Sequence, residues 1–184
     1  VDLQEVEQRL ERVCWIERAL VVRKPPDRIG VELVERRRAA GVELDAIYGI
    51  SRDGVLLPED RAAGEPEQVL NLPVISGLEA AGDSLWLGME MRDPALMALL
   101  RWWEEAAVAD AEFCLNVVRI TPLKGHSAKL QMADGLEVRL PLDGVGRRLQ
   151  TLRRLLPRVY REYPAPAYID LRFAGQAVIG STET

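Results

Sequence analysis

The chain has 184 residues, of which 48% are hydrophobic, so it is long enough to form one large or two small packed domains. Acidic residues outnumber basic ones by 29 to 24, and the net charge of −5 gives no overall electrostatic support for nucleic-acid binding. The sequence has no apolar run of about 18 residues, which a membrane-spanning helix needs.

The first predicted elements are a helix and two strands. Asp2 and Glu5 suit the N-cap and third position of a helix over 2–13, and Leu3, Val6, Leu10 and Val13 recur at helical spacing. β-Forming residues predict a strand over 15–22, which must stop at Pro25 and Pro26 because proline cannot donate to a ladder. Alternating apolar residues predict a half-buried strand over 29–35.

The middle of the chain is less regular. We expect a strand over 42–50, a tight turn at Asp53-Gly54, a short strand over 55–57 and a loop over 58–66. The apolar stretch 70–77 indicates a buried crossing. Residues 79–92 are ambiguous, and we expect an insertion there with a short strand at 85–88.

The second half alternates helices and strands. Asp93 and Pro94 predict the start of a helix, whose apolar stripe includes Leu96, Leu99, Leu100, Trp103 and Ala107. Strands over 113–122, 128–132 and 136–140 form a predicted antiparallel meander, with a turn at 124–126 and another at Asp134-Gly135. A helix from Val145 contains Pro157, which predicts a kink or an early stop. Residues 168–180 read as two strands, or as one bent strand broken at Gly175. The expected fold class is therefore α+β.

The sequence shows no constellation of catalytic, cofactor-binding or metal-binding residues. His126 is the only histidine and lies in a predicted turn, which makes a poor metal site. Asp170 reads as a polar strand residue that pairs with Arg172 or a loop. Cys14 and Cys114 read as small buried hydrophobic residues. Trp103 reads as a core residue, whereas Trp102 stays open between core packing and ligand stacking. We therefore expect no enzyme activity, no cofactor and no metal.

Several segments, taken in order, resemble the extracytoplasmic part of the FtsQ/DivIB cell-division proteins. Residues 15–36 (WIERALVVRKPPDRIGVELVER) resemble the POTRA stretch of that family, and LNLPVISG resembles its apolar crossing. The meander LQMADGLEVRL, the helix RRLQTLRRLL and the closing strand YIDLRF resemble its β domain. Two departures are Arg37 and Arg38 after Glu-Arg, and Leu140-Pro141-Leu142 where many members have Leu-Gly and a basic residue.

The resemblance implies a truncated POTRA-like domain at 1–58, without its first strand and helix, and a mostly antiparallel β domain with flanking helices at 59–184. Because the sequence begins with Val1, we expect a piece of a longer protein that is held in the cell membrane by a single span outside this chain. The implied function is a non-catalytic divisome scaffold on the periplasmic side of the membrane, which binds FtsB/FtsL-like partners.

In this family the partner adds a β-strand to the edge formed by the last strands. The implied partner-binding residues are Phe173, Ala174, Gly175, Gln176, Ala177, Val178, Ile179 and Gly180. Without the resemblance, this segment would read as an ordinary edge strand. A POTRA-bearing module of an outer-membrane assembly or secretion protein is the alternative, which would require a C-terminal series of barrel strands.

Overall fold

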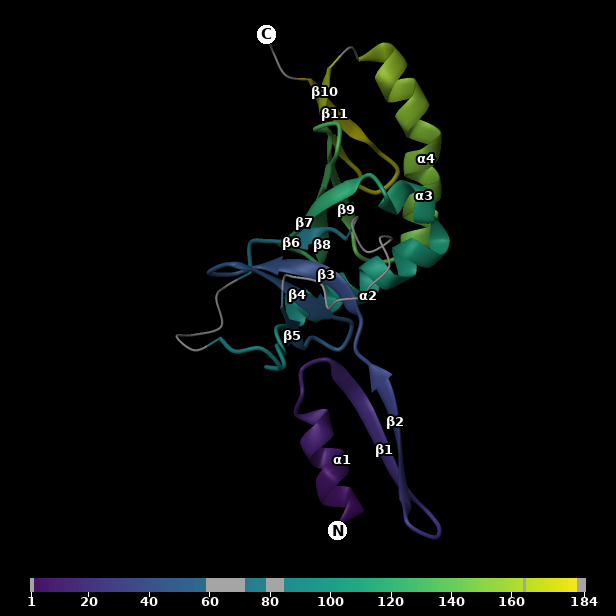
Figure 1. Ribbon diagram of the computed structural model, residues 1–184. Helices are drawn as coiled ribbons and strands as arrows, with labels where there is room; N and C mark the ends of the chain where they lie inside the picture. Colours follow the sequence, from purple (N-terminus) through teal and green to yellow (C-terminus); the bar gives the residue numbers. More distant parts are fainter. Residues whose placement is uncertain (1, 59–71, 79–84, 164, 182–184) are drawn as a thin grey trace.

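The computed structural model describes residues 2–58, 72–78, 85–163 and 165–181, and these residues form an α+β fold with two sheets (Figure 1). A helix and a two-stranded hairpin make up the N-terminal end. A nine-stranded, mostly antiparallel sheet with helices makes up the rest. The predicted fold class is therefore confirmed.

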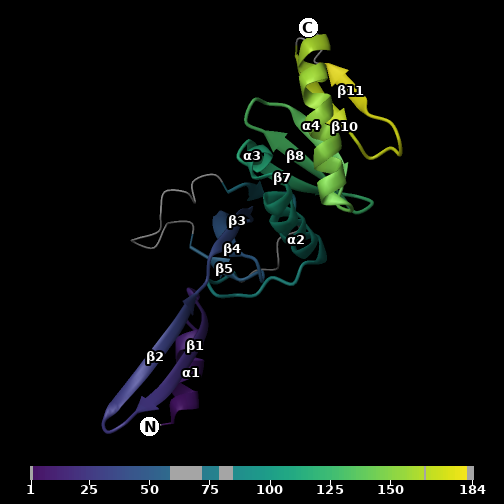
Figure 2. The ribbon, with the colours of Figure 1, turned by 90° about the vertical axis from the view of Figure 1, so that its right-hand side faces the viewer.

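The N-terminal unit contains helix α1 (Leu3–Glu11) and the antiparallel strands β1 (Ile16–Lys24) and β2 (Arg28–Glu35). As predicted, the Asp2 side chain caps α1 and accepts a hydrogen bond from the Gln4 N–H. The helix lies beside β1 (Figure 2), where Ala19 and Val21 are buried. Val13 lies beyond the end of α1 and is exposed, so the helix is shorter than its apolar spacing predicts.

The two outer edges of this hairpin differ. Beside β1, the Glu11 carboxylate accepts from the Ala19 N–H at 3.1 Å and the Glu7 carboxylate accepts from the Val21 N–H at 2.7 Å. Strand β2 pairs with β1 alone among the described strands, and its apolar residues are half exposed: Ile29 at 52%, Val31 at 49% and Leu33 at 47%. Carboxylates thus occupy the edge of β1, whereas β2 is more exposed than predicted.

Arg36 ties the hairpin to the large sheet. Its guanidinium donates to the backbone carbonyls of Cys14 and Ile16 and forms an ion pair with Asp53 at 3.3 Å. Arg52 also pairs with Glu17 across the same junction, at 3.1 Å. The hairpin is therefore joined to the sheet by side chains as well as by the chain connection.

The large sheet has the order β11-β10-β9-β8-β7-β6-β3-β4-β5. Its strands are β3 (Arg38–Glu43), β4 (Ile47–Ser51), β5 (Leu56–Leu57), β6 (Val74–Ile75), β7 (Val117–Leu123), β8 (Ser127–Met132), β9 (Glu137–Pro141), β10 (Pro166–Asp170) and β11 (Val178–Ser181). Parallel pairs join β9 to β10, β3 to β6 and β6 to β7; the other pairs are antiparallel. Strand pairing changes sheet between Glu35 and Arg38, ahead of the predicted domain boundary at residue 58, and the two-domain division remains a prediction.

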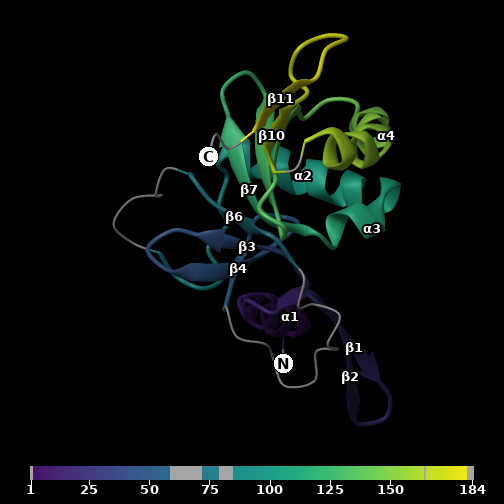
Figure 3. The same ribbon diagram turned by 90° about the horizontal axis from the view of Figure 1, so that it is seen from above.

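Three helices accompany the large sheet: α2 (Pro94–Ala109), α3 (Ala111–Cys114) and α4 (Val145–Glu162). Seen from above, all three helices lie on the same side of strands β7, β10 and β11 (Figure 3). Asp93 caps α2 as predicted, accepting from the Leu96 N–H. Trp102 and Trp103 are both buried in the core between the helices and the sheet, which resolves the open reading of Trp102 as packing.

Three local predictions are wrong. Residues 42–50 are two strands, because the chain turns at 44–46, where the Asp45 side chain accepts from the Ala46 N–H. Cys114 ends helix α3 and does not open a strand, since Asp110 caps that helix through the Phe113 N–H. Residues 85–88 form a turn, not a strand. Of the two outcomes predicted at Pro157, the early stop does not occur, because helix α4 continues to Glu162. The predicted loop over 58–66 lies outside the described residues from position 59 onward.

Candidate partner-binding edge

Strand β11 forms one edge of the large sheet (Figures 1 and 2). It pairs antiparallel with β10, in the register Tyr168↔Gly180, Ile169↔Ile179 and Asp170↔Val178. Among the described strands it has no second neighbour. An edge of this kind presents backbone groups that another strand can pair with.

Backbone geometry shows which residues of β11 face outward. The Leu171 N–H donates to the Arg139 carbonyl of β9 at 2.7 Å. Strand residues alternate in the side to which their N–H and C=O point, so Ile169 also faces β9, whereas the backbone groups of Tyr168 and Asp170 face β11. Their partners Gly180 and Val178 therefore bond back to β10, and the N–H and C=O of Ile179 point away from the sheet.

The structure divides the eight predicted binding residues between a turn and a strand. Phe173, Ala174, Gly175, Gln176 and Ala177 lie in the connection between β10 and β11, whereas Val178, Ile179 and Gly180 lie on β11. The connection contains a turn in which the Gln176 N–H donates to the Phe173 carbonyl at 3.4 Å. Gly175 adopts a φ of 71°, which suits the third position of a type II turn.

Side chains at this edge are apolar on both faces. Phe173 is 52% exposed and Val178 is 40% exposed. Ile179 shares a face with the fully buried Ile169 and packs against the core. A strand added here would meet apolar side chains on each face of the sheet.

The exit from β10 is held by an ion pair between the buried Asp170 and the partly exposed Arg172. The Arg172 guanidinium donates through Nε and Nη2 to both carboxylate oxygens of Asp170, at 2.6 to 3.1 Å, and the Arg172 N–H donates to Asp170 Oδ1 at 3.0 Å. These hydrogen bonds, led by the Arg172 side chain, hold the pKa of Asp170 below its ordinary value. The pair fixes the backbone immediately before Phe173, and it matches the predicted structural role of Asp170.

One group at this edge is missing from the sequence-based prediction. The Arg139 guanidinium lies 4.6 Å from the centre of the Tyr168 ring, and that ring lies over Gly180 of β11. Tyr168 precedes the predicted segment 173–180 in sequence. The alternation of β10 residues could have placed it on the same face as Asp170, but its position beside Val178 and Gly180 depends on strand register.

The opposite edge of the sheet is closed. Leu56 and Leu57 of β5 are fully buried. The Leu56 N–H donates to the Met89 carbonyl, and the Gly88 N–H donates to the Leu56 carbonyl. Segment 88–89 thus uses the backbone groups of Leu56 that a further strand would need, and within the described sheet β11 is the edge that stays open.

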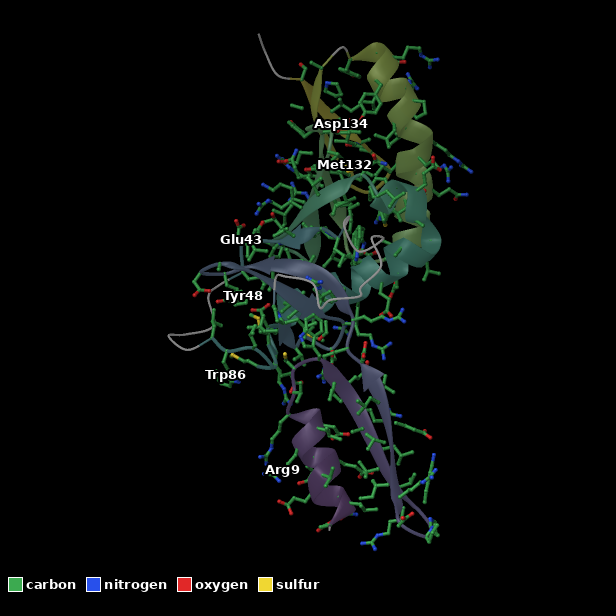
Figure 4. The ribbon with its side chains drawn as sticks, in the orientation of Figure 1. Arg9, Glu43, Tyr48, Trp86, Met132 and Asp134 are labelled. Atoms are coloured by element: carbon green, nitrogen blue, oxygen red, sulfur yellow. The ribbon has the colours of Figure 1, made fainter. Side chains whose placement is uncertain are left out.

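A groove of about 350 Å³ lies between α3, α4 and the β8–β9 turn. Asp134 and Met132, both near the upper end of the sheet in Figure 4, line it together with Arg153 and Tyr160. The Tyr160 hydroxyl donates to Asp134, and burial, followed by that hydrogen bond, raises the pKa of Tyr160 to about 12. Arg153 pairs with Asp110 and Glu112 across the groove, so its charges are already paired.

Other candidate chemistry is sparse. Within the described part of the chain, no three His, Cys, Asp or Glu side chains gather where they could hold a metal ion. His126 lies in the β7–β8 turn with a φ of 53°. Cys14 and Cys114 are not bonded to each other, and burial raises the pKa of the Cys114 thiol to about 11. None of the described helices has the length and apolar character needed to cross a bilayer.

Comparison with known proteins identifies the family. Residues 42–172, more than half of the chain, match the family "Cell division protein FtsQ/DivIB, C-terminal", and residues 1–36 match "POTRA domain, FtsQ-type". The cell division protein FtsQ of Anaeromyxobacter sp. (strain K) is 32% identical over 85% of this chain and 51% of its own length. FtsQ of Salinibacter ruber is 27% identical over 94% of this chain and 67% of its own length.

A solved structure of the major extracytoplasmic domain of DivIB from Geobacillus stearothermophilus covers 70% of this chain and 97% of its own, with 18% identity and a TM-score of 0.43. The chain spans about half to two thirds of the length of the curated relatives it matches. The match over residues 42–172 includes most of the large sheet, and the match over residues 1–36 includes the N-terminal hairpin. This chain therefore belongs to the FtsQ/DivIB family of cell-division proteins.

Proposed function

We propose that this chain is an extracytoplasmic, non-catalytic scaffold of the division machinery that binds an FtsB/FtsL-like protein by strand addition to β11. Membership of the FtsQ/DivIB family supports the division role. The single observation that supports this binding mode is the outward-facing backbone of Ile179 on an edge strand that has no second neighbour in the described sheet. A single membrane span outside residues 1–184 would hold the scaffold at the inner membrane.

The residues next to β11 suit such a partner. Ala177 and Gly180 leave room for a second backbone, while Phe173 and Val178 supply half-exposed apolar surface. Main-chain hydrogen bonds would contribute much of the affinity, and the exposed aromatic ring would be the side chain that buries the most area on binding.

Two proline variants test the proposal. Ala177 directly precedes β11, and extending the alternation of the strand by one residue points its N–H outward like that of Ile179. We therefore expect Ala177→Pro to remove an outward donor without breaking the ladder to β10. The matched control is Ala174→Pro, because proline suits the second position of the type II turn that ends at Gln176. Both variants exchange an alanine for a proline within the same connection.

The measurement is a calorimetric titration of the 184-residue chain with the extracytoplasmic part of the FtsB homologue from the same bacterium. We expect Ala177→Pro to lose at least tenfold in affinity and Ala174→Pro to bind like the unmodified chain. Circular dichroism melting shows whether each variant is folded. Wild-type affinity in a folded Ala177→Pro variant would place the partner elsewhere.

A further inference from the structure

The ring of Tyr168 lies directly across Gly180. A Cβ atom built on Gly180 would lie 2.1 Å from Cε1, 2.6 Å from Cζ and 2.8 Å from Cδ1 of Tyr168. The two residues are register partners on the face of the sheet that carries Val178. Only glycine leaves space for the ring at this position of the edge strand.

The position of the ring gives the direction of its hydroxyl group. Cε1 and Cζ form the outer part of the ring, and both lie over Gly180. The hydroxyl is one bond beyond Cζ, so it reaches across β11 from β10 toward the unpaired edge. None of the hydrogen bonds within the described residues uses this hydroxyl.

Charged neighbours hold the ring in place. The Arg139 guanidinium lies 4.6 Å from the ring centre, which is within the range of a cation–π contact. Arg139 in turn bonds to Glu137 at 2.6 Å and lies 4.0 Å from Asp170, which Arg172 holds. The ring is therefore fixed between the Arg139 guanidinium and the backbone of Gly180.

We propose that Tyr168 is a specificity-determining residue for the strand that adds to β11. This inference rests on the proposed function of β11 as the binding edge. A strand added beside β11 would lie about 4.8 Å from it. The residue of the added strand that lies opposite Gly180 would have no side chain facing it at that position of β11. That residue packs against the outer edge of the Tyr168 ring and accepts a hydrogen bond from its hydroxyl.

The hydroxyl group of Tyr168 defines the chemistry of that partner residue. It bears a hydrogen-bond acceptor, as glutamate and glutamine do, because the phenol hydroxyl has a proton to donate. Tyr168, the residue that contacts the partner, thus lies on β10, one strand inward from the edge. It reaches the partner because position 180 is a glycine.

The test is a titration of the 184-residue chain with the extracytoplasmic part of the FtsB homologue. Tyr168→Phe removes only the hydroxyl, and we expect it to lower the affinity about 3- to 10-fold with an unchanged melting temperature. Gly180→Ala displaces the ring, and we expect a loss of at least 10-fold. Tyr48→Phe on β4 removes a phenol hydroxyl far from β11 and serves as the control with wild-type affinity.

A double variant separates this contact from general disruption of the strand. If Gly180→Ala acts by moving the ring, then Tyr168→Ala/Gly180→Ala binds no more weakly than Tyr168→Ala alone. Additive losses would overturn the inference, as would wild-type affinity of Tyr168→Phe. Should Ala177→Pro abolish binding while Tyr168→Phe binds normally, β11 remains the binding edge and only the role of Tyr168 fails. Normal binding by folded Ala177→Pro overturns both proposals.

Discussion

The ion pair between the buried Asp170 and the partly exposed Arg172 makes a measurable prediction about stability. The Asp170 side chain is 4% exposed and accepts hydrogen bonds from the Arg172 backbone and guanidinium. Asp170→Asn keeps one oxygen for the Arg172 N–H but removes the charge. A hydrogen bond to a charged group contributes about 1.5 to 3 kcal/mol, and the Arg172 side chain is one third exposed, so water replaces part of the loss. We expect a destabilisation of about 2 kcal/mol.

Urea unfolding at pH 7, followed by the fluorescence of the buried Trp102 and Trp103, measures this change in the free energy of unfolding. A loss of about 2 kcal/mol corresponds to about 4 to 8 °C in melting temperature for a chain of this size. The matched control is Asp143→Asn, because Asp143 is 73% exposed and lies 4.0 Å from Arg148. That exposed pair contributes at most about 1 kcal/mol.

The same pair predicts a pH dependence. The folded pKa of Asp170 lies below its ordinary value, chiefly because of the Arg172 hydrogen bonds. Its contribution to stability is therefore fully present above the unfolded pKa of about 4 and is lost as pH falls through the lower folded pKa. The difference between wild type and Asp170→Asn should be equal at pH 7 and pH 5.5 and should shrink below about pH 4. A difference near zero at pH 7, or one undiminished at pH 2.5, would refute this reasoning.

Two further predictions concern other parts of the chain. Glu7→Ala/Glu11→Ala uncovers the N–H groups of Val21 and Ala19, so hydrogen exchange at these two amides should accelerate more than at the amide of Glu32, the ladder partner of Leu20 in the hairpin. Equal acceleration at all three amides would indicate unfolding of the hairpin instead. Cys114 should react with a disulfide reagent at pH 8 much more slowly than Cys14. Burial, followed by the charge of Asp110, raises the pKa of Cys114 to about 11, whereas Cys14 is partly exposed. Equal reaction rates for the two thiols would contradict the buried position of Cys114.

Helix ends and apolar periodicity were predictable from the sequence because each depends on residues close together in the chain. Asp2 and Asp93 cap the helices as predicted, and both meander turns of the large sheet lie where expected. The turn at 44–46 escaped prediction because it contains no glycine or proline, and Asp45 alone supplies the side-chain bond that marks it. Phe113 and Cys114 read as a strand because an apolar run of this length suits either structure.

The candidate edge was predictable only in part. Its position near the C-terminus came from the resemblance of YIDLRF to a family motif, and that β11 is the edge of the large sheet follows from the strand order. The Tyr168 ring over Gly180 depends on the register of two antiparallel strands and on the cation–π contact with Arg139. Register is set by the whole sheet, so local sequence patterns do not specify such a contact.

The uncovered side of β2 has a consequence for work with the protein in solution. Its half-exposed Ile29, Val31 and Leu33 share a face, and the strand has an open row of hydrogen-bonding groups beside them in the described structure. Two copies of the protein could pair along this row by backbone hydrogen bonds. Sulfate and other salts that strengthen hydrophobic contact would favour this association. Self-association through β2 would then compete with any ligand for free protein, so light scattering at several concentrations belongs beside each titration.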